Sequence, residues 1–95
     1  MGVYNYLYMN EKRKKLVQRL KIIEGQVRGL QDMLIKDKYC IDIITQTSAV
    51  KQALSGIEDV LMENHLGTCL IAQIKNGKEK KATDEILKVY RLKRK

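Results

Sequence analysis

The sequence predicts an all-α fold, a protomer of three helices with a long second helix, on three observations. Apolar residues recur three and four positions apart through most of the 95-residue chain, which is the period of one helix face. Proline, tryptophan and phenylalanine are absent, whereas sheet-rich domains use turn residues and aromatic strands. Side chains that are 44% hydrophobic and 32% charged are typical neither of a disordered chain nor of a membrane protein.

The first helix is predicted to follow a short arm. Residues 1–9 hold three of the five tyrosines without helical periodicity, so we expect a flexible arm before a single helical domain at residues 10–95. Asn10 is a favourable N-cap, and the acidic Glu11 follows it where the helix dipole favours a negative charge. Apolar residues then alternate at spacings of four and three, which predicts a helix packed along its length on another helix: Leu16, Leu20, Ile23, Val27, Leu30 and Leu34.

The second and third helices are predicted from the same periodicity. After a break around residues 36–38, the alternating spacing restarts with Ile43, Thr47, Val50, Leu54, Ile57 and Leu61. Apolar spacing continues to Ile74, so we expect this helix over about residues 39–75, and Asn76 and Gly77 predict its end. Ala82, Ile86 and Val89 indicate a third helix of about three turns before the basic tail.

The long second helix indicates an oligomer. Its apolar rows are too extended to be buried by the two companion helices of one chain, and helices depend on such packing for stability. We therefore expect at least a dimer, built around two antiparallel second helices.

The charge distribution indicates a surface for a polyanion. Residues 1–28 carry seven basic and two acidic side chains, residues 29–74 three and six, and residues 75–95 nine and three. Two basic ends around an acidic middle are typical of nucleic-acid binding. Solvated lysine faces on an ordinary helical protein are an equally good interpretation of charge alone.

Several functional classes are not supported by the sequence. It has no nucleophile–base pair, no paired carboxylates in an apolar segment and no glycine-rich phosphate loop, so we do not expect an enzyme. No apolar run approaches the length of a membrane span, and the N-terminus lacks the order of a signal peptide, so we expect no membrane association. Two cysteines in such a chain favour reduced thiols and a cytoplasmic location.

The two cysteines and the single histidine form a candidate metal site between two chains. His65 and Cys69 stand four residues apart and share one helix face. A histidine and a cysteine that pack together without binding a metal show the same spacing. Cys40 precedes His65 by 25 residues, roughly 37 Å along a helix. An antiparallel pair centred near Ala53 and Leu54 would bring Cys40 beside the partner's His65 and the partner's Cys69.

This donor set favours Cu(I), one ion per protomer. Two thiolates and one imidazole suit three-coordinate Cu(I), whereas Zn(II) requires a fourth ligand and Ni(II) or Co(II) more nitrogen and oxygen donors. A site at a subunit interface indicates sensing or a structural role.

Three stretches resemble the copper-sensing operon repressors and their nickel-, formaldehyde- and sulfide-sensing relatives. The residues from Arg19 to Gly29, RLKIIEGQVRG, resemble the family's first-helix signature, and KYCID at 38–42 with HLGTC at 65–69 resembles its ligand segments. The resemblance covers about residues 10–90. It implies an antiparallel dimer with a four-helix-bundle core, dimers that pair into a homotetramer, and an operator-bound repressor that Cu(I) releases, which derepresses copper-resistance genes.

The resemblance also assigns roles to individual residues. It implies that Cys40 is a ligand from one protomer and that His65 and Cys69 come from the other. It further implies that Tyr39 and Glu85 form a hydrogen-bond network with the ligand histidine. Nickel- and cobalt-sensing relatives have extra histidines, which this chain lacks. Some members carry a basic residue near the middle of the second helix, where this chain has Ser55 and Gly56.

Candidate DNA contacts come from both basic ends of the chain. No helix-turn-helix or zinc finger is visible, so we expect the basic residues to track phosphates, with sequence choice depending on DNA shape. The candidates are Lys12, Arg13, Lys14, Lys15, Arg19, Lys21, Lys75, Lys78, Lys80 and Lys81.

Two other functions remain open. One is a thiol or persulfide redox-sensing repressor in which Cys40 and Cys69 form a bridge and His65 only activates a thiol. The other is a purely structural helical oligomer with a basic face.

Overall fold

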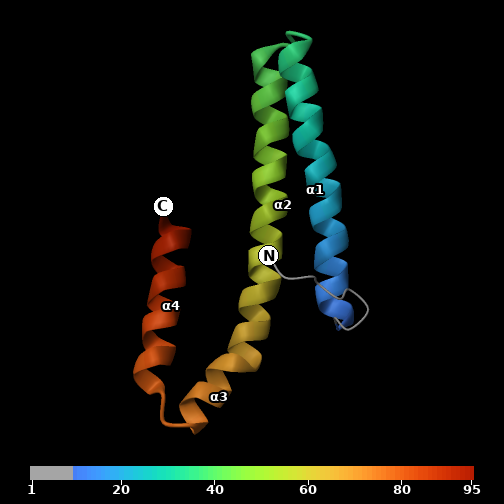
Figure 1. Cartoon of the computed structure of the whole chain (residues 1–95). Coiled ribbons are helices and arrows are strands. Elements are labelled where there is room, and N and C mark those ends of the chain that lie inside the picture. Colours follow the sequence, from blue (N-terminus) through green and yellow to red (C-terminus); the bar gives the residue numbers. More distant parts are fainter. Residues whose placement is uncertain (1–9) are drawn as a thin grey trace. The chain divides into compact units, whose positions relative to one another are not determined.

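The computed structural model describes residues 10–95 and is helical over nearly all of them (Figure 1). The helices are α1 (Glu11–Ile35), α2 (Cys40–Gly67), α3 (Cys69–Lys75) and α4 (Glu79–Arg94). No strand occurs within these described residues, which confirms the all-α prediction. The expected arm, residues 1–9, lies outside the described part. The chain forms two compact units, Met1–Glu58 and Asp59–Lys95.

The first unit pairs α1 with the greater part of α2 as an antiparallel hairpin (Figure 1). Asn10 caps α1 as predicted, because its side-chain oxygen accepts a hydrogen bond from the Arg13 backbone N–H at 2.8 Å. At the other end of α1, the Lys38 N–H donates to the Met33 carbonyl at 3.0 Å and Asp37 takes a φ of 52°. This closure satisfies the last carbonyls of the helix and reverses the chain within a few residues.

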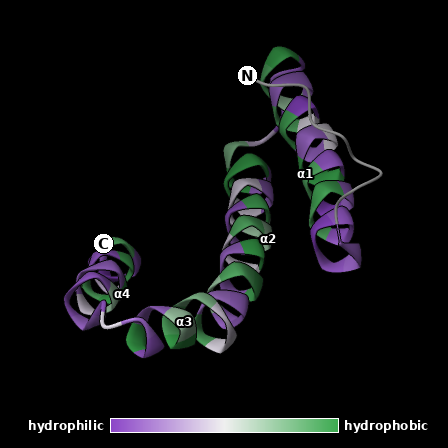
Figure 2. Ribbon diagram, turned by 60° about the horizontal axis from the view of Figure 1, so that its bottom comes forward, coloured by the Kyte–Doolittle hydropathy of each residue, from purple (hydrophilic) through white to green (hydrophobic). Residues whose placement is uncertain are grey.

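The core of the first unit uses only part of each predicted apolar row. Leu16 and Ile23 of α1 are buried, as are Val50 and Ile57 of α2. The other members of the two rows are less well covered, and Leu54 remains 42% exposed. Figure 2 shows hydrophobic residues recurring along α2 and α3, whereas α4 is mainly hydrophilic. One chain therefore leaves much of its apolar surface in contact with solvent.

The predicted long second helix is interrupted at Thr68, which separates α2 from α3. Thr68 takes φ −129° and ψ −70°, outside the helical region. Its hydroxyl donates to the Asn64 carbonyl at 2.7 Å, a bond that competes with the helical ladder and bends helices. The preceding Gly67 adds the low helix propensity of glycine. The backbone bonds from Thr68 N to Asn64 O and from Ala72 N to Thr68 O, both 3.0 Å, continue across the break.

The second unit contains the end of α2, with α3 and α4. Gly77 ends α3 as predicted, with a φ of 73°, and the following N–H of Lys78 donates to the Gln73 carbonyl at 2.8 Å. Helix α4 is longer than the three turns that were predicted and includes most of the basic tail. Ala82 is its buried residue at 2% exposure.

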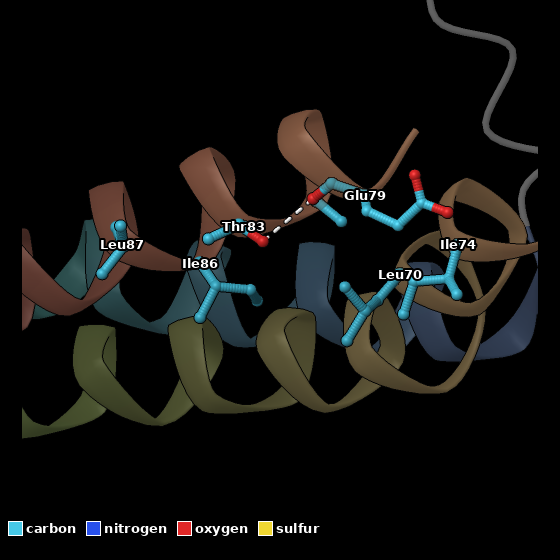
Figure 3. Close-up of a pocket in the computed structure, with 7 residues that line it drawn as sticks. Leu70, Ile74, Glu79, Thr83, Ile86 and Leu87 are labelled. Carbon is cyan, nitrogen blue, oxygen red and sulfur yellow. Dashed lines mark hydrogen bonds between the residues drawn. The ribbon is translucent and has the colours of Figure 1, made fainter. Parts of the chain in front are cut away.

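An apolar pocket of about 330 Å³ lies between α3 and α4 (Figure 3). It is lined by Leu70, Ile74, Glu79, Ala82, Thr83, Ile86 and Leu87. None of the candidate metal ligands is among these residues, so the pocket is separate from the candidate metal chemistry. None of the described helices combines the length and apolar character that crossing a membrane requires.

Candidate metal centre

The three predicted ligands lie at helix ends. Cys40 is the first residue of α2 and His65 lies in its last turn, while Cys69 is the first residue of α3. Both cysteines are free and exposed, and His65 is half-buried. Cys40 belongs to the first compact unit, and His65 and Cys69 belong to the second. The break at Thr68 falls between His65 and Cys69, so these two residues do not share one uninterrupted helix.

The three candidate ligands are not grouped together in the part of the chain that the structure describes. Among residues 10–95, no three histidine, cysteine or acidic side chains are grouped so that they could hold a metal ion. A thiol beside the break does make a polar contact, because the Thr68 hydroxyl lies 3.7 Å from the Cys69 Sγ atom. The donor types of the three candidate ligands are soft sulfur and borderline nitrogen.

Glu85 has a hydrogen-bond partner that the sequence analysis did not identify. The Gln73 Nε2 atom of α3 donates to the Glu85 carboxylate of α4 in a part-buried contact. Gln73 stands four residues after Cys69 on α3, so the two residues lie on one face of the helix. This spacing is the one feature of the sequence that places Gln73 near a candidate ligand. The Gln73 Oε1 atom is buried and has no hydrogen-bond partner. Tyr39, the other residue expected near the histidine, is 66% exposed immediately before α2.

The candidate DNA contacts lie on two separate elements. The first-helix residues among them all lie on α1, and Lys14 pairs there with Glu11 at 3.3 Å. Lys75 ends α3 and Lys78 precedes α4, whose first turns carry Lys80 and Lys81. Lys80 pairs with Asp84 at 3.6 Å.

The Arg19 side chain contacts α2 at Gly56, which the sequence analysis noted only as a position without the basic residue of some family members. A Cβ atom added to Gly56 would lie only 2.7 Å from the Arg19 Nη2 atom. The missing Gly56 side chain therefore leaves the space in which the guanidinium lies. No sequence pattern signals this contact, because it depends on how α1 packs on α2.

The protomer is small and helical, and its apolar rows are incompletely buried. It carries thiol and imidazole donors and basic helix faces. This is the organisation of a metal-responsive regulator of transcription. Residues 12–91 match the family model described as metal-sensitive transcriptional repressor. The chain belongs to this family, which confirms the resemblance drawn from the three sequence stretches.

Individual relatives agree with this assignment. The chain is 40% identical over 82 residues to the copper-sensing transcriptional repressor CsoR of Bacillus subtilis, covering 86% of this chain and 81% of the relative. It is 40% identical over 67 residues to the copper-sensing repressor RicR of Mycobacterium tuberculosis, covering 70% of each. The crystal structure of the copper-sensing repressor CsoR with Cu(I) from Geobacillus thermodenitrificans matches with a TM-score of 0.84 and 35% identity, over 100% of this chain and 95% of that one.

Proposed function

We propose that this protein is a Cu(I)-responsive transcriptional repressor that binds operator DNA without metal and releases it when Cu(I) binds. The observation that supports this most directly is the donor set. Two free, exposed thiols and one half-buried imidazole occur in a chain of the metal-sensitive repressor family. A set of only three such donors favours Cu(I), because Zn(II) requires a fourth ligand and Ni(II) or Co(II) more nitrogen and oxygen donors. Release of the operator derepresses copper-resistance genes.

The proposed site is shared by two protomers, with one Cu(I) for each protomer. Cys40 of one chain joins the partner's His65 and the partner's Cys69, and the antiparallel dimer forms two such sites. The absence of a three-donor group within residues 10–95 of one chain supports a shared site. The exposed apolar residues of α1 and α2 support the dimer, and a further pairing of dimers gives the tetramer.

Tyr39 and Glu85 are proposed to transmit the bound state. A histidine that gives one ring nitrogen to a metal has its tautomer fixed, and its other nitrogen then donates a hydrogen bond to a neighbour. Glu85 lies on α4 in the second unit, as His65 does on α2. We propose that Glu85 gives up its bond from Gln73 when it pairs with His65, and that this exchange couples metal binding to the position of α4.

Operator binding is proposed to use the basic residues of α1 and those around the start of α4. A repressor acts where its operator is, so we propose a cytoplasmic location. Residues 10–95 are proposed to serve as one metal-sensing and DNA-binding domain.

The test is an anaerobic Cu(I) titration with single-cysteine variants. Cys40→Ala and Cys69→Ala should each abolish tight binding, because each removes one of two thiolates from every site. When the two variants are mixed and exchange subunits, about half of the dimers are hybrid and about a quarter of the sites return, since each hybrid contains one complete site. Failure of the mixture to recover any site would exclude a shared site, and retention of tight binding by either variant would exclude the ligand set.

The redox alternative is separated in the same preparation. If Cys40 and Cys69 instead act as a thiol switch, mild oxidant should give a cross-linked dimer on non-reducing electrophoresis and release the operator without copper. A Cu(I)-responsive repressor should release the operator when Cu(I) is added under anaerobic reductant, where no disulfide can form.

A further inference from the structure

The contact between Arg19 and Gly56 combines a cation with a glycine that leaves room for it. Gly25 and Gly29, which lie inside α1, have nothing within 4 Å of an added Cβ atom. At Gly56 the added atom would lie 2.7 Å from Arg19 Nη2 and 4.0 Å from Arg19 Cζ. Glycine inside a helix is unfavourable relative to alanine. At Gly56, unlike at Gly25 and Gly29, a Cβ atom would also meet a side chain of the neighbouring helix.

The Arg19 guanidinium lies beside Gly56 without an acidic partner among the described residues. Arg19 is exposed, and within the described residues no carboxylate forms an ion pair with it. Lys14 on the same helix, by contrast, pairs with Glu11 at 3.3 Å. The donors of Arg19 can therefore bind an external anion.

Arg19 also belongs to a row of cations on α1. Lys12, Lys15 and Arg19 are spaced by three and four residues, so they lie along one face of the helix. All three are exposed, and like charges at this spacing disfavour the isolated helix. A polyanion such as the DNA backbone would relieve this repulsion by neutralising the row.

We propose that Gly56 is a positioning residue for operator binding: the space above it holds the Arg19 guanidinium against α2, where it binds a DNA phosphate. This inference rests on the proposed repressor function. It adds that Arg19 of α1 supplies the phosphate-binding charge on this part of α2. The guanidinium can lie there because Gly56 has no side chain. Because the displaced group is the far end of a flexible side chain, an alanine at this position should move the guanidinium without unfolding the helix pair.

The experiment measures operator affinity at several salt concentrations for the full-length, metal-free protein. The probe is a promoter duplex selected by its copper-reversible binding to the wild-type chain. Arg19→Ala should weaken binding about tenfold or more, the size of one charge-assisted hydrogen bond. It should also reduce the salt slope by about 0.9 for each phosphate that is no longer neutralised.

Gly56→Ala tests the positioning role against a matched glycine. It should weaken operator binding by about threefold to tenfold, the cost of an unfavourable side-chain rotamer. Gly29→Ala, the same exchange at an open position of α1, should bind as the wild type does. Cu(I) affinity, helical content and oligomer mass should be unchanged in both variants. In the Arg19→Ala background, Gly56→Ala should have no further effect.

A charge swap completes the test. Arg19→Ala combined with Gly56→Arg should regain affinity and salt slope, because it returns a guanidinium to the same place from α2. If Gly56→Ala binds like Gly29→Ala, or if the swap fails to improve on Arg19→Ala, the positioning role is wrong. If Arg19→Ala itself binds the duplex normally, the proposed DNA surface on α1 is wrong, which is a separate failure.

Discussion

The half-buried carboxylate of Glu85 has a hydrogen-bond partner on the neighbouring helix. Gln73 donates to it from α3, and the remaining Gln73 oxygen is buried without a hydrogen bond. A carboxylate that moves from Gln73 to another donor exchanges one hydrogen bond for another, so the net free energy is a small difference between the strengths of the two bonds. Gln73 would thus set how much metal binding changes the position of α4.

Exchange of Gln73 for methionine tests this competition. Gln73→Met removes both the donor to Glu85 and the unpaired buried oxygen while preserving the length of the side chain. We expect the ratio of operator affinities without and with Cu(I) to increase, by about tenfold or more for one hydrogen bond to a charged group. The measurement is a titration of the operator duplex with and without Cu(I).

Two variants control this result. Gln52→Met makes the same exchange at an exposed glutamine of α2 and should leave the ratio unchanged. Glu85→Ala should lose coupling free energy of about 1–3 kcal/mol, and Gln73→Met should have no effect in that background. A Gln73→Met variant that loses coupling as Glu85→Ala does would show that Gln73 supports Glu85 instead of competing with it.

At the scale of elements, the ends of the helices are closed by local backbone conformation. Gly77 ends α3 in the left-handed region, at a φ of 73°, and links it to α4. Side chains with a Cβ atom are disfavoured there, whereas a helical glycine such as Gly29 gains from a Cβ atom.

The two glycines should therefore respond in opposite directions to the same exchange. Gly77→Ala should lower the free energy of unfolding by about 1–2 kcal/mol, the penalty of the left-handed conformation. Gly29→Ala should raise it by about 0.5–1 kcal/mol, since alanine has higher helix propensity and nothing obstructs its Cβ atom. Urea unfolding of both variants at one protein concentration measures the difference, because oligomer formation contributes to apparent stability. Equal shifts would contradict the conformational origin.

At the scale of the whole molecule, the partly exposed apolar rows offer a surface for the dimer that the proposed site requires. Leu54 is 42% exposed, and it lies at the predicted centre of the antiparallel pair of second helices. Ile22 is 64% exposed but is outside the predicted rows. A comparison of substitutions at Leu54 and Ile22 therefore distinguishes a residue of the predicted dimer interface from an apolar residue that is merely exposed.

Leu54→Glu should yield monomers that no longer bind Cu(I) tightly. Two glutamates would face each other across the symmetry axis, where burying unpaired like charges is unfavourable. Ile22→Glu should keep the dimer and its Cu(I) sites. Light scattering gives the mass, and anaerobic titration gives the number of tight sites. A monomeric Leu54→Glu protein that still binds one Cu(I) tightly would contradict the cross-chain site.

Much of the fold was predictable because it depends on local preferences. The spacing of apolar residues predicted α1, α2 and α4, and Asn10 and Gly77 marked helix ends that the structure confirms. The helix break was not predicted, because apolar spacing continues through it. The side-chain bond that Thr68 forms to the Asn64 carbonyl has counterparts at Thr45 and Thr47, where α2 is unbroken. The residue types of the candidate ligands were also visible in the sequence, and their assembly into one site stays a prediction.

By itself, the sequence determined the helical class, the thiol and imidazole side chains available at Cys40, His65 and Cys69, and the two basic ends of the chain. Only the tertiary structure showed that Arg19 lies in the space above Gly56 and that Gln73 holds Glu85. Helical periodicity and ligand chemistry are properties of residues close together in the chain. The contacts at Gly56 and Glu85 join residues on different helices, so they depend on how the backbones pack and which side chains fill the space between them.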